Sequence, residues 1–113
     1  MDLRRAKETM VTPERGEDWL VGLGMAAKVR PCLVLSFAVL DTERALATSV
    51  AHTTAQRGTR FEVSVPVSFL RAGVFDAQNL ITVPHAKYIR KLGKLTEAHL
   101  QKVEAAVRLW LSL

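Results

Sequence analysis

The sequence predicts a mainly β protein with some α-helix: a small, curled antiparallel sheet with one short helix and one C-terminal helix. Short apolar segments between residues 19 and 83 are separated by glycine, proline or polar residues, which is typical of sheets built from short strands. Residues 96–113 carry an apolar repeat of helical period. The length of 113 residues, 49% of them hydrophobic and 24% charged, fits one soluble globular domain.

The chain is expected to consist of a flexible tail and one folded domain. Residues 1–12 mix both signs of charge without periodicity, so we expect a flexible N-terminal tail, followed by a single domain over residues 13–113. The first predicted strand is closed by Gly22 and Gly24, and the last ends at Pro84. The five predicted strands cover residues 19–21, 31–39, 45–51, 60–65 and 74–83.

The fourth strand has the clearest pattern. Phe61, Val63 and Val65 alternate with polar or charged residues, which predicts one buried and one solvated face. Residues 86–92 then predict a short helix that stops at Gly93.

The C-terminal helix is predicted from its cap and its apolar stripe. Thr96 is a good N-cap residue, and Leu95 and Leu100 occupy the two positions of a hydrophobic staple around it. The stripe that follows has helical spacing and should pack on the sheet. It consists of Leu100, Val103, Val107 and Leu111.

Composition excludes several classes of protein. The single cysteine, Cys32, rules out an internal disulfide and a multi-cysteine zinc site and favours the cytoplasm. Because Cys32 lies in an apolar segment, we expect a buried small hydrophobic residue and not a nucleophile. The apolar run over residues 31–40 is too short to span a membrane, and the first residues lack the pattern of a signal peptide.

Two motif-like features do not predict a site. Residues 22–27 match the glycine pattern of dinucleotide-binding loops, but Pro31 and the next strand follow before a crossover helix could form. His52, His85 and His99 have neither helical pairing nor a cysteine partner, so no metal site is expected.

The net charge of +5 is concentrated in the middle of the chain. Residues 57–94 contain two acidic residues, Glu62 and Asp76, against a larger set of cations. One interpretation is a face that meets phosphates or an acidic partner, and the other is a simple contribution to solubility. The cations are Arg57, Arg60, Arg71, Lys87, Arg90, Lys91 and Lys94.

Basic and hydroxyl side chains also gather in predicted loops. Lys28 and Arg30 come just before Pro31 and a buried strand, and Arg57 and Arg60 come just before the fourth strand. The third strand ends at a histidine followed by two threonines, residues 52–54. Cations on loops around hydroxyls and an imidazole predict a phosphate-binding site.

The chain resembles the PemK/MazF toxins in several of these segments. Residues 15–24 resemble the first strand of that family, although its Gly-Asp is Gly-Glu-Asp here, and residues 28–36 resemble its Arg-Pro loop and following strand. Residues 80–83 and 91–96 resemble the family's C-terminal region. The resemblance covers residues 13–113 and implies an SH3-like barrel with appended helices.

The resemblance implies a function as well as a fold. Such toxins belong to type II toxin–antitoxin systems, are homodimers, and are neutralised by an acidic antitoxin. They are sequence-specific endoribonucleases that cleave single-stranded RNA without a metal or other cofactor. The ribose 2′-hydroxyl attacks the adjacent phosphate and leaves 2′,3′-cyclic phosphate and 5′-hydroxyl ends.

The implied site residues can be assigned one by one. Arg30 matches the arginine of the Arg-Pro loop and is expected to bind the phosphate and assist proton transfer. Thr53 is preferred as the second catalytic residue, while His52 offers an imidazole that could act as acid or base. Lys28, with Arg57 and Arg60, is expected to bind RNA.

Two noncatalytic functions are alternatives. A related toxin of the same fold could bind a protein such as DNA gyrase, but such a protein has no need of Arg30. A simple single-strand-binding barrel would need a stacking platform, whereas the chain has only 4 Phe, 2 Trp and 1 Tyr and Phe61 is expected to face the core.

Overall fold

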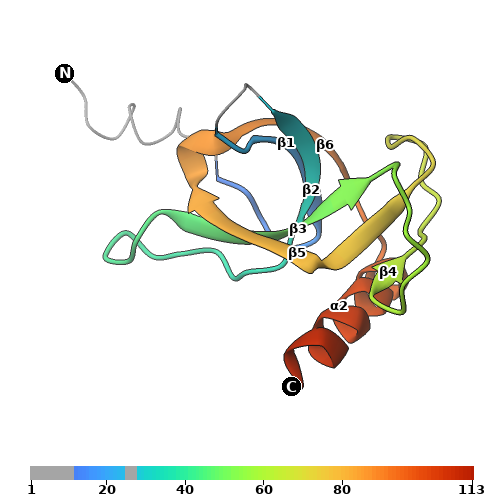
Figure 1. Cartoon of the computed structure of the whole chain (residues 1–113). Coiled ribbons are helices and arrows are strands. Elements are labelled where there is room, and N and C mark those ends of the chain that lie inside the picture. Colours follow the sequence, from blue (N-terminus) through green and yellow to red (C-terminus); the bar gives the residue numbers. More distant parts are fainter. Residues whose placement is uncertain (1–11, 25–27) are drawn as a thin grey trace.

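The computed structural model describes residues 12–24 and 28–113; the expected tail, apart from Thr12, lies outside them. Within these ranges the strands form one curled sheet, and the C-terminal helix packs beside β4 and β5 (Figure 1). The mainly β fold with a C-terminal helix is confirmed. The elements are β1 (Glu17–Gly22), β2 (Val29–Val34), β3 (Leu46–Thr53), β4 (Glu62–Val63), β5 (Val74–Pro84), the 3₁₀ turn η2 (His85–Lys87), β6 (Tyr88–Lys94) and α2 (Glu97–Leu111).

The sheet is antiparallel throughout, in the order β4-β5-β3-β2-β1-β6. In the described chain its edge strands β4 and β6 are not hydrogen-bonded to each other, so the expected barrel is curled but open. The register of β3 against β5 shifts between Val50 and Ala51. Such an irregularity bends a strand, which helps β5 to pair with β3 and, near its start, with β4.

The second strand is shorter than predicted. β2 ends at Val34, because the hydroxyl of Ser36 accepts the N–H of Thr48 at 2.9 Å and so replaces the next backbone acceptor of the ladder. Beyond it the chain leaves the sheet, and Phe37 is 88% exposed. Leu35 N–H still donates to the carbonyl oxygen of Thr48 at 2.9 Å, so it is the apolar character of residues 36–39 that does not reflect strand pairing.

The fourth strand is also shorter than predicted. Only Glu62–Val63 pair with β5, because the Glu62 carboxylate accepts the N–H groups of Arg57 and Thr59 and closes a turn just before it. Val65 is buried as expected, while Val63 and Phe61 are half-buried.

The predicted short helix over residues 86–92 is wrong. One 3₁₀ turn is followed directly by β6, because Tyr88 is fixed inside the fold. Its hydroxyl bonds Ser49 Oγ at 2.6 Å and donates to the carbonyl oxygen of Ala47 at 3.3 Å, and its ring meets Trp19 edge to face. Pairing with β1 overrides local helix propensity.

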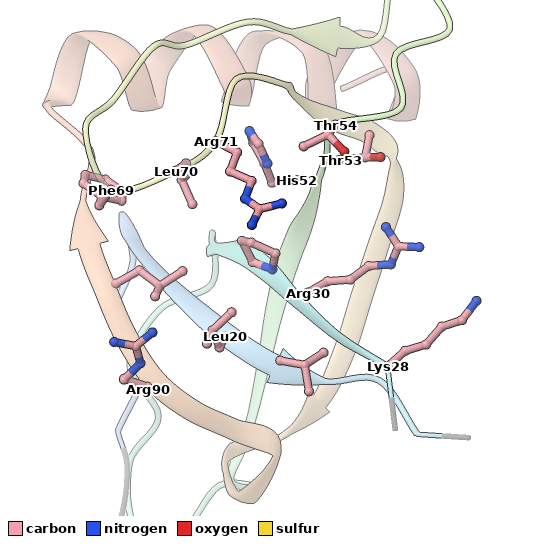
Figure 2. A pocket seen from close by; sticks show the side chains of 13 residues that line it. Leu20, Lys28, Arg30, His52, Thr53, Thr54, Phe69, Leu70, Arg71 and Arg90 are labelled. Atoms are coloured by element: carbon pink, nitrogen blue, oxygen red, sulfur yellow. The ribbon is translucent and has the colours of Figure 1, made fainter. Parts of the chain in front are cut away.

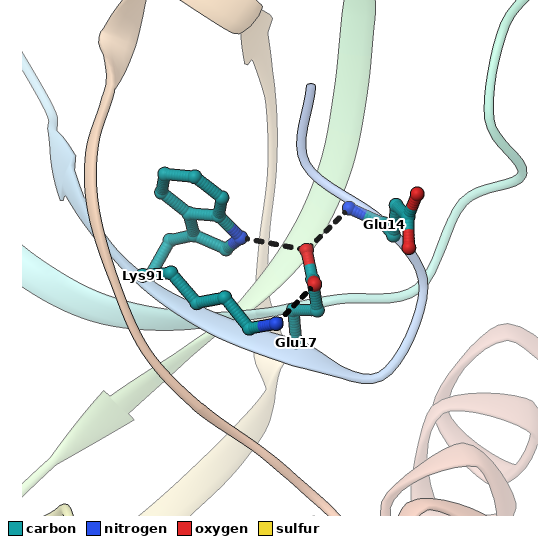
Figure 3. Close-up of polar contacts among 4 residues, drawn as sticks. Glu14, Glu17 and Lys91 are labelled. Atoms are coloured by element: carbon teal, nitrogen blue, oxygen red, sulfur yellow. Dashed lines mark hydrogen bonds and ion pairs between the residues drawn. The ribbon is translucent and has the colours of Figure 1, made fainter. Parts of the chain in front are cut away.

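An ion pair strengthens the junction of β1 and β6 (Figure 3). The Glu17 carboxylate pairs with Lys91 Nζ at 2.7 Å and accepts the Trp19 Nε1–H and the Glu14 N–H. Burial opposes ionisation of Glu17, but these partners outweigh it and lower the pKa of the carboxyl. These contacts hold β6, the strand that carries Arg90, against β1.

The C-terminal helix begins as predicted. Thr96 Oγ accepts the N–H of His99 at 3.3 Å, and Leu95 and Leu100 are both buried beside the cap. The stripe is buried only in its first half, since Leu111, at the end of the helix, is 45% exposed.

The structure argues against a catalytic cysteine and against a dinucleotide-binding loop. Cys32 is fully buried as expected, and burial raises the pKa of its thiol to about 12, so it is no nucleophile at neutral pH. Gly22 pairs with Val29 in an antiparallel hairpin of β1 and β2. That pairing is incompatible with the parallel crossover of a dinucleotide-binding unit.

Candidate active site

An open cleft of about 630 Å³ lies where the start of β2 and the end of β3 face β6 and the segment that precedes β5 (Figure 2). Apolar side chains, among them Leu20, Phe69 and Leu92, form part of its wall. Around them lie four cations, Lys28, Arg30, Arg71 and Arg90, together with His52, Thr53 and Thr54. We refer to it as the basic cleft.

The electrostatics of the basic cleft favour an anion. No acidic residue lines it in the part of the chain that the structure describes. The ion pairs Arg15–Glu104 and Lys91–Glu17 involve none of its four cations. Cations that form no ion pair in the described chain and surround an apolar hollow attract polyanions and strengthen hydrogen bonds to phosphate.

Arg30 is set in place by β2. Its backbone pairs with Val21 of β1, and Pro31 follows it with a fixed φ. The side chain is half-buried and extends toward Thr53 (Figure 2). It also borders a neighbouring hollow of about 240 Å³, which Thr53 and Arg57 line as well.

Thr53 is the last residue of β3 and lies at the edge of the cleft. Its Oγ accepts the N–H of Ala55 at 3.0 Å. A hydroxyl that accepts in this way still has its own proton to donate. Thr53 can therefore donate a hydrogen bond to an oxygen of a ligand in the cleft.

His52 is buried in the cleft wall. Its ring meets Phe75 edge to face, with ring centroids 5.0 Å apart, and the residue is 5% exposed. Burial lowers the pKa of the imidazole, so the neutral form dominates at pH 7. A neutral imidazole is able to accept a proton.

The remaining predicted RNA-binding residues lie in different places. Lys28 lines the basic cleft. Arg57 lines only the neighbouring hollow, where Glu62 and Asp76 also lie. Arg60 lines neither; its guanidinium stacks 4.7 Å above the ring of Phe61.

Sequence reasoning did not select Arg71 and Arg90 as site residues, yet both line the cleft. The sequence feature that pointed to them is the surplus of basic over acidic residues between positions 57 and 94. Arg71 lies in a segment without regular structure, and Arg90 lies in the strand that was predicted as a helix.

Two further classes of site are not found in the described residues. They contain no group of three or more His, Cys, Asp and Glu side chains that could hold a metal ion. Among them there is also no helix long and apolar enough to cross a membrane.

Comparisons with known proteins give a consistent picture. The model of a family described as PemK-like, MazF-like toxin of type II toxin–antitoxin system matches residues 14–111. An endoribonuclease from a mycobacterial species has a TM-score of 0.76 and 26% identity, over 93% of this chain and 96% of that chain. A comparison with curated proteins gave no match.

Two more solved structures are similar over most of their length. A mycobacterial endoribonuclease in complex with its cognate antitoxin has a TM-score of 0.78 and 27% identity, over 89% of this chain and 96% of that chain. The Mycobacterium tuberculosis toxin MazF-mt6 has a TM-score of 0.73 and 26% identity, over 86% and 97%.

Proposed function

Because the chain belongs to the PemK-like, MazF-like toxins of type II toxin–antitoxin systems, we propose that it is a sequence-specific endoribonuclease that cleaves single-stranded RNA in the cytoplasm. The observation that carries the proposal is the basic cleft, where four cations and no described acidic residue surround Thr53 and His52. Similar solved structures are endoribonucleases, which supports the same activity here.

The reaction is an internal transesterification. The 2′-oxygen of the ribose forms a bond to the adjacent phosphorus, and the bond from phosphorus to the 5′-oxygen breaks. The 2′-hydroxyl gives its proton to a base, and the 5′-oxygen receives a proton as it leaves. The products have 2′,3′-cyclic phosphate and 5′-hydroxyl ends, so no external nucleophile is consumed.

Arg30 has the main electrostatic role in this mechanism. Negative charge builds on the non-bridging oxygens as phosphorus becomes five-coordinate, and a fixed guanidinium stabilises it. Arginine stays protonated at neutral pH and is a poor base, so its assistance to proton transfer acts through hydrogen bonding. Since guanidinium groups supply the charge stabilisation, we expect cleavage to proceed without a metal ion.

The second role belongs to Thr53 or His52. Thr53 has a hydroxyl proton that can be donated to a phosphate oxygen. His52, neutral in its buried site, could take the 2′-hydroxyl proton, and its imidazolium could then give a proton to the 5′-oxygen. The residue whose loss slows cleavage more is the partner of Arg30.

We also propose the partners of the family for this chain. A homodimer would give RNA a groove bordered by Lys28 and Arg57, with Arg60 contributing at the periphery. An acidic antitoxin segment would neutralise the toxin by covering the same cations. A similar endoribonuclease has been solved with its cognate antitoxin, which supports that partner.

The test is to incubate the purified protein with single-stranded RNA in excess EDTA and to analyse the ends of the products. Cleavage at defined sites, with cyclic phosphate and 5′-hydroxyl ends, is expected. Failure to cleave a broad pool of RNA sequences would refute the proposal. Inhibition of DNA gyrase without RNA cleavage would support the noncatalytic alternative instead.

A further inference from the structure

The segment over residues 66–73 forms one wall of the basic cleft and is the later part of the connection between β4 and β5. We refer to it as the cleft strap. It has no regular secondary structure apart from a turn in which Leu70 N–H reaches the carbonyl oxygen of Val67 at 3.4 Å. Its position must therefore come mainly from contacts with the sheet.

One anchor of the cleft strap is the ring of Phe69, which lies directly on the backbone of β6. A Cβ atom added at Gly93 would be 2.5 Å from Phe69 Cδ1, a distance that real Cβ atoms do not reach. The aromatic ring can therefore pack this closely only because residue 93 has no side chain.

The second anchor is the end of the cleft strap at Gly73. A Cβ atom there would be 2.3 Å from the carbonyl oxygen of Thr53 and 2.8 Å from Cε1 of His52. The backbone of the strap thus touches the two residues at the end of β3 that are candidates for catalysis. Both anchors limit how far the residues between them can move.

Arg71 lies between these anchors. Figure 2 shows its side chain reaching from the cleft strap into the cleft beside His52, while Arg30 extends from β2. The ion pairs of the described chain leave its guanidinium without a carboxylate. Because the anchors fix the backbone on either side of Arg71 and its guanidinium has no carboxylate partner in the described chain, its fork of N–H donors can bind two oxygens of a phosphate.

We propose that Arg71 is a second catalytic arginine, which binds the non-bridging phosphate oxygen that Arg30 does not bind. This inference rests on the proposed ribonuclease function. The five-coordinate phosphorus has two non-bridging oxygens that gain charge, and two arginines from different walls can each stabilise one of them. Because the strap is already anchored, little reorganisation is needed when the charge develops.

The experiment measures single-turnover cleavage rates of three RNA substrates. One is unmodified, and the other two contain a single phosphorothioate at the cut site, as the pure Rp or the pure Sp diastereomer. Sulfur is larger than oxygen and a weaker hydrogen-bond acceptor, so each diastereomer weakens the contact to one oxygen. We expect Arg71→Ala to slow cleavage of unmodified RNA about 100-fold and to remove the rate penalty of one diastereomer. Arg30→Ala should remove the penalty of the other diastereomer.

Two matched variants separate this role from general charge and from folding. Arg71→Lys keeps the charge but not the fork and should restore only part of the rate. Arg90→Ala removes another cation of the cleft and should weaken RNA binding while both diastereomer penalties remain. Circular dichroism of each variant should match the wild type, because Arg71 and Arg90 are exposed.

The outcomes are distinct. If Arg71→Ala cleaves unmodified RNA as fast as the wild type, or keeps both diastereomer penalties, Arg71 does not bind a non-bridging oxygen and the inference is wrong, while the proposed function stands. If the wild-type protein cleaves no RNA, the proposed function and this inference fall together.

Discussion

A change of Asp18 to asparagine should make the stability of this protein less sensitive to a rise in pH from 5 to 8. Asp18 lies in β1 between Leu33 of β2 and Gly93 of β6 and is fully buried. Neither carboxylate oxygen has a hydrogen-bond partner. Burial therefore raises the pKa of Asp18 to about 7, from an ordinary value of 3.8.

The sign and size of the effect follow from proton linkage. The folded state holds the Asp18 proton more tightly than the unfolded chain, so its contribution to stability is present at low pH and is lost as pH rises through 7. With these pKa values the loss between pH 5 and pH 8 is about 2.5 kcal/mol. The buried His52, whose pKa is lowered, acts in the opposite direction below pH 6.5.

The assay is urea unfolding of wild type and Asp18→Asn at several pH values from 5 to 8. The difference between the two proteins cancels the contribution of His52, and the variant should gain about 2.5 kcal/mol relative to wild type over this range. Glu14→Gln, at an exposed carboxylate, is the matched control and should follow the wild type. A constant difference between wild type and Asp18→Asn would refute the reasoning.

Four further predictions concern the cleft. Arg30→Ala should lower the single-turnover cleavage rate about 100-fold or more, whereas Arg44→Ala, at an exposed arginine outside the cleft, should not. Of Thr53→Ala and His52→Ala, the variant with the larger loss of rate identifies the partner of Arg30; equal, small losses would exclude both. Gly93→Ala should displace the Phe69 ring, cost about 1–3 kcal/mol in thermal unfolding and slow cleavage; an unchanged melting temperature would contradict the first anchor. If all four cleft cations contact phosphates, RNA affinity measured by fluorescence anisotropy should fall about 50-fold between 50 and 200 mM salt, and antitoxin binding should weaken with salt too; indifference to salt would show mainly apolar contacts.

Local sequence signals predicted the elements whose structure is set locally. The cap at Thr96 and the buried positions Leu100 and Val103 are recognisable because cap and stripe lie within a few residues of one another. β6 was missed because its conformation depends on distant partners: Tyr88 bonds Ser49, 39 residues away in sequence. No local pattern records such a contact.

The candidate site was predictable to a similar extent. Arg30, His52 and Thr53 lie at strand ends that the sequence pattern locates, and the fold brings them to one cleft. Arg71 was not selected, because its place depends on the contact of Gly73 with β3 and of Phe69 with Gly93. Those contacts are possible only because Gly73 and Gly93 have no side chain, and each glycine touches residues that are far from it in the sequence.

The most direct test of the central claim is cleavage of an RNA in which one ribose, at the cut position, is replaced by 2′-deoxyribose. If the 2′-hydroxyl is the nucleophile, the substitution removes it and cleavage at that position should stop, while the substrate still binds the basic cleft. Matched RNA with the deoxyribose one nucleotide away should still be cut at the original position. Cleavage at the substituted position at the normal rate would contradict the mechanism.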